Sequence, residues 1–239
     1  MASFRIATYN IHKCKGMDGR VRPQRIAEVI EQLRADVVAL QEVVGLDDRN
    51  GADQGRYLAH QLGLHYTHGE TRKHAGFGYG NAVLSRLPVG ASCNHNVTVP
   101  GREERGCLRV DIHLPHGPTV HVFNVHLGTS FRERQVQAYK LLHDELLRSK
   151  LLEGPRVVLG DFNEWTRGLA TRMLANEFTS ADLRLHANRT RTYPGFFPFL
   201  HLDHVYFDQT LRLESITLHR TPTALIASDH LPLIAEFAY

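Results

Sequence analysis

Short apolar segments separated by polar loops run through the whole chain. Residues 4–9, Phe-Arg-Ile-Ala-Thr-Tyr, alternate between apolar and polar with the period of a β-strand. Residues 37–40, Val-Val-Ala-Leu, are apolar at every position, which is typical of a strand covered on both faces. The same reasoning predicts further strands at 81–85, 107–114, 119–125, 155–159, 202–207 and 231–237.

A few stretches have helical spacing instead. Pro23 stands where a first helical turn accepts proline, and apolar residues then follow at helical intervals: Ile26, Val29, Ile30 and Leu33. A shorter helix is predicted at 54–62, and another after Trp165. The segment from Ser130 to Glu133 has capping-box spacing. It opens a helix with these residues on one face: Val136, Tyr139, Leu142, His143 and Leu146. Strands and helices together predict an α/β fold in which helices cover sheets.

The bulk properties predict one globular domain over residues 1–239. Apolar residues make up 42% of the 239 residues and charged residues 22%, which is a globular composition. There is no linker-like tract, no internal repeat and no apolar run near the ~20 residues that span a bilayer. The first residues lack the layout of a signal peptide, so we expect a cytoplasmic protein. Three cysteines without close pairing indicate reduced thiols: Cys14, Cys93 and Cys107.

The arginines are more informative than the formal net charge of +3. They form four clusters along the chain: Arg20, Arg22 and Arg25; Arg102, Arg105 and Arg109; Arg132 and Arg134; Arg189 and Arg191. A planar guanidinium group suits phosphate oxygens. Each cluster taken alone is explained equally well by a solvated surface.

Acidic, histidine and asparagine side chains recur where the predicted strands end. They are Asn10, Glu42, His126, Asp161 with Asn163, Asp203, and Asp229 with His230. Any one of them is readily explained as a cap or strand terminator. Six such strand ends predict a shared site, because functional groups usually sit on loops carried by rigid sheet ends. Carboxylates at 42, 161 and 229 suit a hard cation such as Mg²⁺, whereas zinc prefers a tight His/Cys set. The chain has no serine-nucleophile elbow and no glycine-rich phosphate loop.

The motifs, in order, resemble those of the endonuclease/exonuclease/phosphatase superfamily. They are TYNIHK at 8–13, LQEV at 40–43, GNAVLSRLPV at 80–89, NVHL at 124–127, GDFN at 160–163, LDHVY at 202–206 and SDHLPL at 228–233. The resemblance spans almost the whole chain and is nearer to the small bacterial hydrolases than to DNase I or the apurinic endonucleases. It implies a four-layer α/β/β/α sandwich of two packed mixed sheets flanked by helices. It also implies metal-assisted attack of water on a phosphate ester.

The resemblance assigns roles around the metal and the attacking water. Glu42 becomes the principal ligand of Mg²⁺, for which Mn²⁺ could substitute. Asn10 helps to hold the metal site and Asp161, and Asp229 supports the metal or the water. Asp161 orients or deprotonates the water, and Asn163 positions both the phosphate and that aspartate.

The remaining roles concern the phosphate itself. His230 contacts the phosphate and is held by Asp203, which we expect to raise the pKa of the histidine. His126 is the second histidine that reaches the phosphate, and Arg105 stands where some family nucleases bind substrate phosphate. In the DNase I type of enzyme the histidine equivalent to His126 pairs with a glutamate. Here the corresponding position is Asn81, so we predict an Asn81–His126 hydrogen bond and a less basic His126.

Three loops are candidates for choosing the substrate: residues 13–22, 69–80 and 189–200. The last combines arginine with aromatic residues, which could bind a nucleic-acid backbone and stack bases. The same aromatic residues could dip into a membrane interface, or could pack beneath the last strands. We expect phosphodiester hydrolysis in nucleic acid, with a phospholipid or phosphoinositide-type phosphoesterase as the alternative. A catalytically inactive binding module is a third hypothesis, and the sequence indicates no obligate protein partner.

Overall fold

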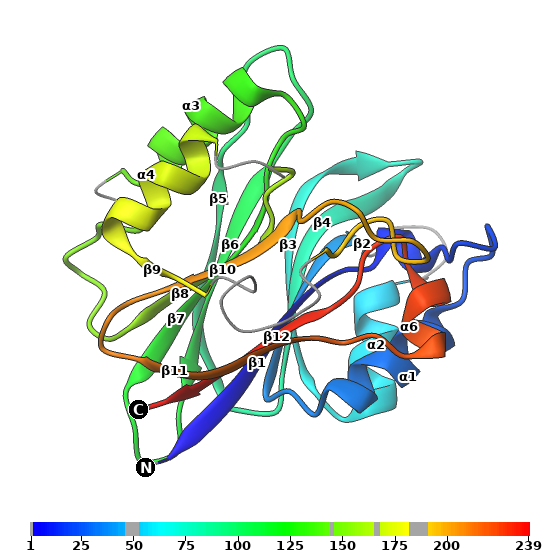
Figure 1. Ribbon diagram of the computed structural model, residues 1–239, viewed down its shortest axis with the longest axis horizontal. Helices are drawn as coiled ribbons and strands as arrows, with labels where there is room; N and C mark the ends of the chain where they lie inside the picture. The colour runs from blue at the N-terminus through cyan, green and yellow to red at the C-terminus, as the bar shows by residue number, and fades with distance from the viewer. Residues whose placement is uncertain (1, 46–52, 144–145, 165–167, 182–190) are drawn as a thin grey trace.

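Two six-stranded mixed β-sheets stack face to face in the computed structural model, which describes residues 2–45, 53–143, 146–164, 168–181 and 191–239 (Figure 1). The first sheet has the order β11 (Arg212–Leu218), β12 (Leu233–Ala238), β1 (Ser3–Asn10), β2 (Val37–Val44), β4 (Phe77–Ser85) and β3 (His65–His74). The second has the order β5 (Val89–Asn96), β6 (Gly106–His113), β7 (Thr119–His126), β8 (Arg156–Asp161), β10 (Asp203–Phe207) and β9 (Thr179–Ser180).

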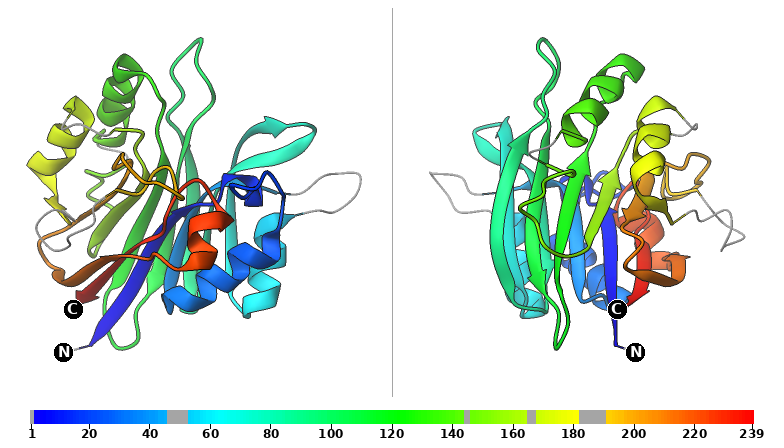
Figure 2. Two further views of the ribbon diagram at one scale, coloured as in Figure 1. Left: turned by 45° about the vertical axis from the view of Figure 1, so that its right-hand side comes forward. Right: turned by 90° about the vertical axis from the view of Figure 1, so that its left-hand side faces the viewer.

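Helices cover the outer face of each sheet (Figure 2). The first sheet carries α1 (Pro23–Leu33), α2 (Gln54–Leu62) and α6 (Pro222–Ala227), and the second carries α3 (Phe131–Leu141) and α4 (Leu169–Glu177). A central core fills the space between the sheets, with Ile6 and Val37 from one sheet facing Val110 and Leu159 from the other. The arrangement is the predicted four-layer α/β/β/α sandwich. Among the described helices, none is both long and apolar enough to cross a membrane.

The predicted strand ends meet at one edge of the sandwich. Strand β1 runs parallel to β2, and β7 runs parallel to β8, while the neighbouring strands are antiparallel to them. In each sheet, the carboxyl ends of the two parallel strands therefore lie side by side. The hydrogen bond between Asn10 of β1 and Asp161 of β8 shows that these ends meet across the two sheets. Ser3, at the start of β1, pairs with Ala238, so both chain ends lie at the opposite edge from Asn10 (Figure 1).

A buried polar network joins the two sheets beneath that edge. The Asn124 amide of β7 donates to the carbonyl oxygens of Leu40 and Ala82 in the facing sheet, at 2.8 Å each. Its Oδ1 accepts a 2.7 Å hydrogen bond from Gln41. Asn81 crosses in the other direction and donates to the carbonyl oxygens of Gly106 and Asn124. These bonds fix how the two sheets sit against each other directly below the strand ends.

Replacing Asn124 with alanine should destabilise the protein by about 2–4 kcal/mol, because it leaves several buried polar groups without their partner. The free energy of unfolding, measured by urea denaturation, checks this value. Asn94→Ala is the matched control, since Asn94 is exposed and donates a single hydrogen bond to the Glu70 carbonyl. Equal effects of the two substitutions would contradict a structural role for the network.

Helix α3 forms where it was predicted, but its buried face differs from the expected one. Val136 and Tyr139 are exposed, and Ser130 makes no side-chain cap. The helix instead buries polar side chains: Arg134 donates to the carbonyl oxygens of Gly128 and Thr129. The predicted face was wrong at Val136 and Tyr139, because the helix turns Arg134 and Gln137 toward the polar loop after β7. Leu142 of that face is buried, beside Leu141 in the apolar cluster outside the second sheet. The helix expected after Trp165 begins at Leu169, and Trp165 itself lies outside the described residues.

The three cysteines are free thiols, as expected. Cys14 and Cys107 are buried, and burial raises the pKa of the Cys14 thiol to about 12. Cys93 is exposed. None of the three lies in the lining of the cleft described below.

Candidate active site

Asp161 lies at the centre of the converging strand ends. Its Oδ1 accepts a 2.8 Å hydrogen bond from the Asn163 backbone N–H. Its Oδ2 accepts a 3.0 Å hydrogen bond from the Asn10 amide and faces Nε2 of His230 at 3.5 Å and of His126 at 3.7 Å. Burial raises the pKa of Asp161, and the two histidines oppose that effect. A buried carboxylate surrounded by nitrogen donors is a candidate base.

The turn after β8 sets the direction of this carboxylate. Gly160 has φ of +147°, and a Cβ there would lie 1.9 Å from the Val125 carbonyl oxygen of the neighbouring strand. Glycine is therefore required for β7 and β8 to approach each other. Beyond Asp161, Phe162 is buried and its N–H donates to the Leu202 carbonyl. Asn163 follows with φ of +50° and donates its side-chain amide to the Leu127 carbonyl.

Glu42 is aimed into the site by a β-bulge. The β2–β4 register passes from Leu40 opposite Ala82 to Val43 opposite Gly80, so two residues of β2 stand across from the single residue Asn81. Bulges bend a strand and redirect its side chains. Glu42 itself has φ of +59°, a left-handed conformation that costs free energy for a residue with a side chain. The buried surroundings hold this costly conformation in place.

Asn10 connects Glu42 to Asp161. Its Nδ2 donates to Glu42 Oε1 at 3.2 Å and to Asp161 Oδ2 at 3.0 Å, while its Oδ1 accepts from the His12 backbone N–H. Rotating the amide by half a turn would place its oxygen against both carboxylates, which is unfavourable. This orientation agrees with the predicted role of holding Asp161. It favours a positioning role over direct coordination of a metal by Asn10.

His230 and Asp203 form the predicted pair. His230 Nδ1 lies 2.9 Å from Asp203 Oδ2, and both residues are buried. Burial by itself lowers the pKa of His230, but the carboxylates of Asp203 and Asp161 outweigh it and raise the pKa to about 10. His230 is therefore an imidazolium at neutral pH, with Nε2 directed toward Asp161.

Asp203→Asn should lower the pKa of His230 by roughly 1–3 pH units, because an opposite charge within hydrogen-bond distance is removed. NMR titration of the His230 ring, with a metal chelator present, measures the change. Asp18→Asn removes an exposed carboxylate paired with Arg25 and should leave this titration in place. An unchanged pKa in Asp203→Asn would show that the pair does not set the charge of His230.

His126 pairs with an arginine rather than with Asn81. Arg105 Nη1 lies 3.2 Å from Nδ1 and 3.3 Å from Nε2 of His126, and it donates to the ring nitrogen that carries no proton. The predicted Asn81–His126 hydrogen bond was wrong, because the Asn81 amide donates to two backbone carbonyls of the facing sheet. Burial, and then the Arg105 charge, lower the pKa of His126 to about 4. His126 is less basic, as expected, but for a different reason.

These residues line an open cleft of about 380 Å³. It is bordered by Lys13, Glu42, Arg72, Tyr79, Glu103, Arg105, His126, Thr129, Asp161, Asn163, Tyr193, Leu200, Leu202, Asp229 and His230. Of the ten predicted site residues, seven line this cleft, and Asn10, Asn81 and Asp203 are not among the lining residues. Asp229 is half-buried, with Oδ1 3.5 Å from His12 Nδ1.

Several cleft residues were not predicted as site residues. Lys13 Nζ contacts Glu42 Oε2 at 2.6 Å. Glu103 accepts from Arg72 at 2.6 Å and from Arg105 at 2.8 Å, and so bridges two arginines at the rim. The Arg72 guanidinium also lies 4.4 Å from the centre of the Tyr79 ring. Lys13 and Arg72 belong to two of the segments predicted to choose the substrate, 13–22 and 69–80, but the prediction of a loop at 69–80 was wrong because most of it forms β3 and β4.

The arginines of the four predicted clusters lie in different places relative to the cleft. Arg105 reaches the cleft, whereas Arg25 pairs with Asp18 and Arg109 with Asp111 away from it. The exposed Arg132 and Arg191 are not in the cleft lining, and Arg189 lies outside the described residues. A position in a cluster therefore did not by itself identify a phosphate ligand.

The aromatic segment that leads into β10 is exposed beside the cleft. Phe196, Phe197 and Phe199 are 67%, 74% and 53% exposed, so they do not pack beneath the last strands. Tyr193 turns inward, and its ring lies 5.0 Å from the His230 ring. The segment is tied to the site by a 2.6 Å hydrogen bond from the Gly195 N–H to the Asp229 carbonyl.

The oxygen donors of the cleft suit a hard divalent cation. Glu42 and Asp229 present carboxylates to the same space, and Mg²⁺ takes one or two protein carboxylates and keeps several waters. Within the described ranges, no three His, Cys, Asp or Glu side chains converge into a preformed metal cage. The Lys13 ammonium beside Glu42 indicates that this carboxylate attracts a cation.

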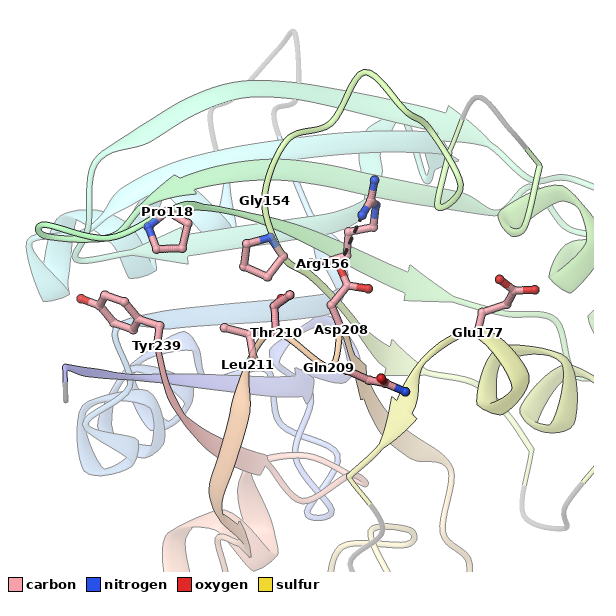
Figure 3. A pocket seen from close by; sticks show the side chains of 10 residues that line it. Pro118, Gly154, Arg156, Glu177, Asp208, Gln209, Thr210, Leu211 and Tyr239 are labelled. Carbon is pink, nitrogen blue, oxygen red and sulfur yellow. Dashed lines mark hydrogen bonds and ion pairs between the residues drawn. The ribbon is translucent and has the colours of Figure 1, made fainter.

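A second, larger cavity of about 710 Å³ lies at the other end of β8 (Figure 3). Its wall includes Arg156, which is paired with Asp208 at 3.3 Å, together with Pro118 and Tyr239. It contains none of the predicted site residues. The smaller cleft is therefore the candidate active site.

Known proteins resemble this chain in sequence and in fold. The family model described as endonuclease/exonuclease/phosphatase family matches residues 7–230. The uncharacterized protein YbhP of Escherichia coli is 34% identical over 253 aligned residues, covering 98% of this chain and 96% of that protein. The mannosyl-6-phosphatase Bt3783 of Bacteroides thetaiotaomicron superposes with a TM-score of 0.79 at 18% identity, covering 99% and 100% of the two chains. The sulfate-bound human Nocturnin catalytic domain gives 0.78 at 21% identity, covering 99% and 94%.

Proposed function

Because the chain belongs to the endonuclease/exonuclease/phosphatase family, we propose that it is a divalent-metal-dependent phosphodiesterase that cleaves nucleic acid by attack of an activated water. Membership in the family supports a phosphoester hydrolase. The observation that carries the finer proposal is the Asp161 carboxylate, enclosed by Asn10, His126 and His230 beside Glu42. The family match over residues 7–230 also supports treating 1–239 as a single domain.

Asp161 is the proposed base. Its raised pKa brings it nearer to neutral pH, where it accepts a proton from water more effectively than an ordinary aspartate does. The Asn163 N–H and the Asn10 amide hold its two oxygens, so the carboxylate is oriented before the substrate arrives. Preorganised groups of this kind lower the barrier because they need no rearrangement during the reaction.

The two histidines act on the phosphate in different charge states. His230, held as an imidazolium by Asp203, is proposed to donate to a phosphate oxygen and to stabilise charge that develops there. His126 is neutral and buried, and it offers a hydrogen bond rather than a full charge. Arg105 supplies a fixed positive charge next to it, and its side chain is 8% exposed. His230 and Arg105 thus present a titratable and a permanent cation to an anionic group.

Glu42 and Asp229 are the proposed ligands of Mg²⁺, or of Mn²⁺ in its place. Glu42 is anchored through Oε1 by Asn10, which leaves Oε2 to face a cation. Burial opposes ionisation of Glu42, but His126, Lys13 and Asn10 keep its pKa below the ordinary value. The bound cation would supply neutralisation of the phosphate and a lower pKa for a coordinated water.

The rim favours a polymeric phosphodiester. A nucleic-acid backbone can run along the open cleft, where Arg72 and Arg105 would bind its phosphates. The exposed Phe196 and Phe197 can stack on its bases. The same exposed phenylalanines favour the second candidate, a phospholipid or phosphoinositide headgroup reached at a membrane surface. A related fold in Bt3783, described as a mannosyl-6-phosphatase, makes a phosphomonoester a necessary comparison.

A panel of phosphoesters distinguishes these functions. Purified protein with Mg²⁺ is assayed on single- and double-stranded DNA, RNA, bis(p-nitrophenyl) phosphate, a phosphomonoester and anionic phospholipid vesicles, with Asp161→Asn and His230→Ala as controls. Metal-dependent cleavage of nucleic acid that is lost in both variants supports the proposal. Preference for vesicles would favour the lipid candidate. No metal-dependent turnover on any substrate would leave a binding module as the better description, and activity that survives both changes would overturn the site.

A further inference from the structure

The cleft contains a cation supplied by the chain itself. Lys13 Nζ lies 2.6 Å from Glu42 Oε2 and 5.8 Å from the centre of the Tyr79 ring, and the Lys13 side chain is 28% exposed. The other Glu42 oxygen already accepts from Asn10. The ammonium group therefore occupies a carboxylate oxygen that a metal ion at this site would use.

The backbone around Lys13 is held in a costly conformation that directs its side chain into the cleft. His12, Lys13 and Cys14 have φ of 44°, 58° and 56°, a left-handed run that is unfavourable for residues with side chains. Specific bonds maintain it: Gln54 Nε2 donates to the Lys13 carbonyl at 2.7 Å, and the His12 N–H donates to Asn10 Oδ1. Strained backbone that the surroundings fix so firmly is typical of functional positions.

We propose that Lys13 is a displaceable counter-ion of Glu42, which competes with the divalent cation and, once displaced, binds a phosphate oxygen of the substrate. This inference rests on the proposed metal-dependent function. An ammonium and a divalent cation repel each other and cannot both bind Glu42 Oε2 at full strength. Lysine suits the second step because its flexible stem carries three donors that can be redirected. The open cleft, which His126 and His230 also line, gives the ammonium a place to move.

The proposal predicts opposite effects on two affinities. Lys13→Met removes the competing charge at similar side-chain length, so Mn²⁺ should bind roughly tenfold more tightly. The same variant should bind an anion less tightly in the metal-loaded protein, because a phosphate ligand has been lost. A residue that merely stabilises the fold, or one that helps to hold the metal, would not produce tighter metal binding and weaker anion binding together.

The experiment measures Mn²⁺ binding by the EPR signal of the free ion, and then inorganic phosphate binding at saturating Mn²⁺ by calorimetry. Wild type, Lys13→Met and Lys15→Met are compared, since Lys15 is an exposed lysine on the same loop. Lys13→Gln, which keeps a polar contact with Glu42 but carries no charge, replaces Lys13→Met if the latter does not fold. Lys15→Met should match wild type in both measurements.

A measurement on the native side chain complements the variants. Reductive ¹³C-methylation labels the lysines of the wild-type protein, and the Lys13 resonance is assigned by its absence in Lys13→Arg. Its chemical shift should change on addition of Mg²⁺, as the ammonium leaves Glu42. Unchanged or weaker Mn²⁺ binding in the uncharged variants, or a Lys13 resonance that ignores Mg²⁺, would overturn the inference. Mn²⁺ binding that is also insensitive to Glu42→Gln would instead refute the proposed metal site itself.

Discussion

Asp161→Asn should lower kcat on bis(p-nitrophenyl) phosphate by about 100- to 10,000-fold, the range that a positioned general base contributes. The amide has nearly the same shape but cannot accept the proton of the attacking water. It also places an N–H donor against the donors that now surround Asp161, from Asn10 and His230. Steady-state kinetics at saturating Mg²⁺, together with circular dichroism to confirm folding, measure the effect.

The matched control for this change is Asp208→Asn. Asp208 is also an aspartate that accepts a backbone N–H and pairs with a basic side chain, but it lies in the cavity at the opposite end of β8 (Figure 3). Its replacement should leave kcat within about twofold of wild type. If Asp161→Asn keeps more than about a tenth of the wild-type kcat, Asp161 is not the base.

Glu42→Gln should raise the Mg²⁺ concentration for half-maximal activity by at least about tenfold. The carboxylate provides both the charge and the oxygen that a hard cation needs, and a carboxamide provides one neutral oxygen. Activity measured across a Mg²⁺ titration, begun from chelator-treated protein, gives the shift. Glu236→Gln serves as the comparison, because Glu236 also pairs with a basic residue, Arg5, but far from the cleft. An unaltered Mg²⁺ dependence in Glu42→Gln would argue against Glu42 as the metal anchor.

The sequence predicted the buried parts of the fold well. Helix α2 spans the predicted residues 54–62, and β1, β2, β7 and β8 formed within a few residues of the expected bounds. These elements bury apolar side chains, so their burial is encoded in the periodicity of the sequence. The site residues at the ends of β7 and β8 followed from the same elements, because a polar residue stands out where an apolar strand ends.

The edge strands were missed for the opposite reason. Strand β5 reads Val-Gly-Ala-Ser-Cys-Asn-His-Asn and is mostly exposed, and β3 carries six charged or histidine side chains among its ten residues. Such strands pair through their backbone, which leaves no apolar alternation in the sequence. The polar part of the buried face of α3 was missed similarly, because Arg134 donates a hydrogen bond to the Gly128 carbonyl and Gln137 accepts one from the Gly128 N–H.

Partners within the site were harder to predict than membership of it. The resemblance to DNase I-type enzymes paired Asn81 with His126, yet the β2 bulge and the cross-sheet hydrogen bonds direct the Asn81 amide elsewhere. Arg105 reached His126 from a loop whose path has no sequence signature. Lys13 depended on three consecutive left-handed residues, a conformation that the side chains at 12–14 do not predict. Side-chain pairings that depend on the path of a loop or on a β-bulge therefore could not be predicted from the sequence.

The site is divided between the two sheets, so catalytic activity requires that the sheets have docked against each other. Asn10, Glu42 and His230 come from the first sheet or its connections, and Asp161 and Asp203 come from the second. The Asn10–Asp161 and His230–Asp203 contacts therefore exist only when the sheets are docked in register. During refolding, recovered activity should not precede closure of the core between the sheets, whatever secondary structure has already formed. The recovery of activity would then measure when the two sheets dock. Far-ultraviolet circular dichroism reports secondary structure and does not isolate this step.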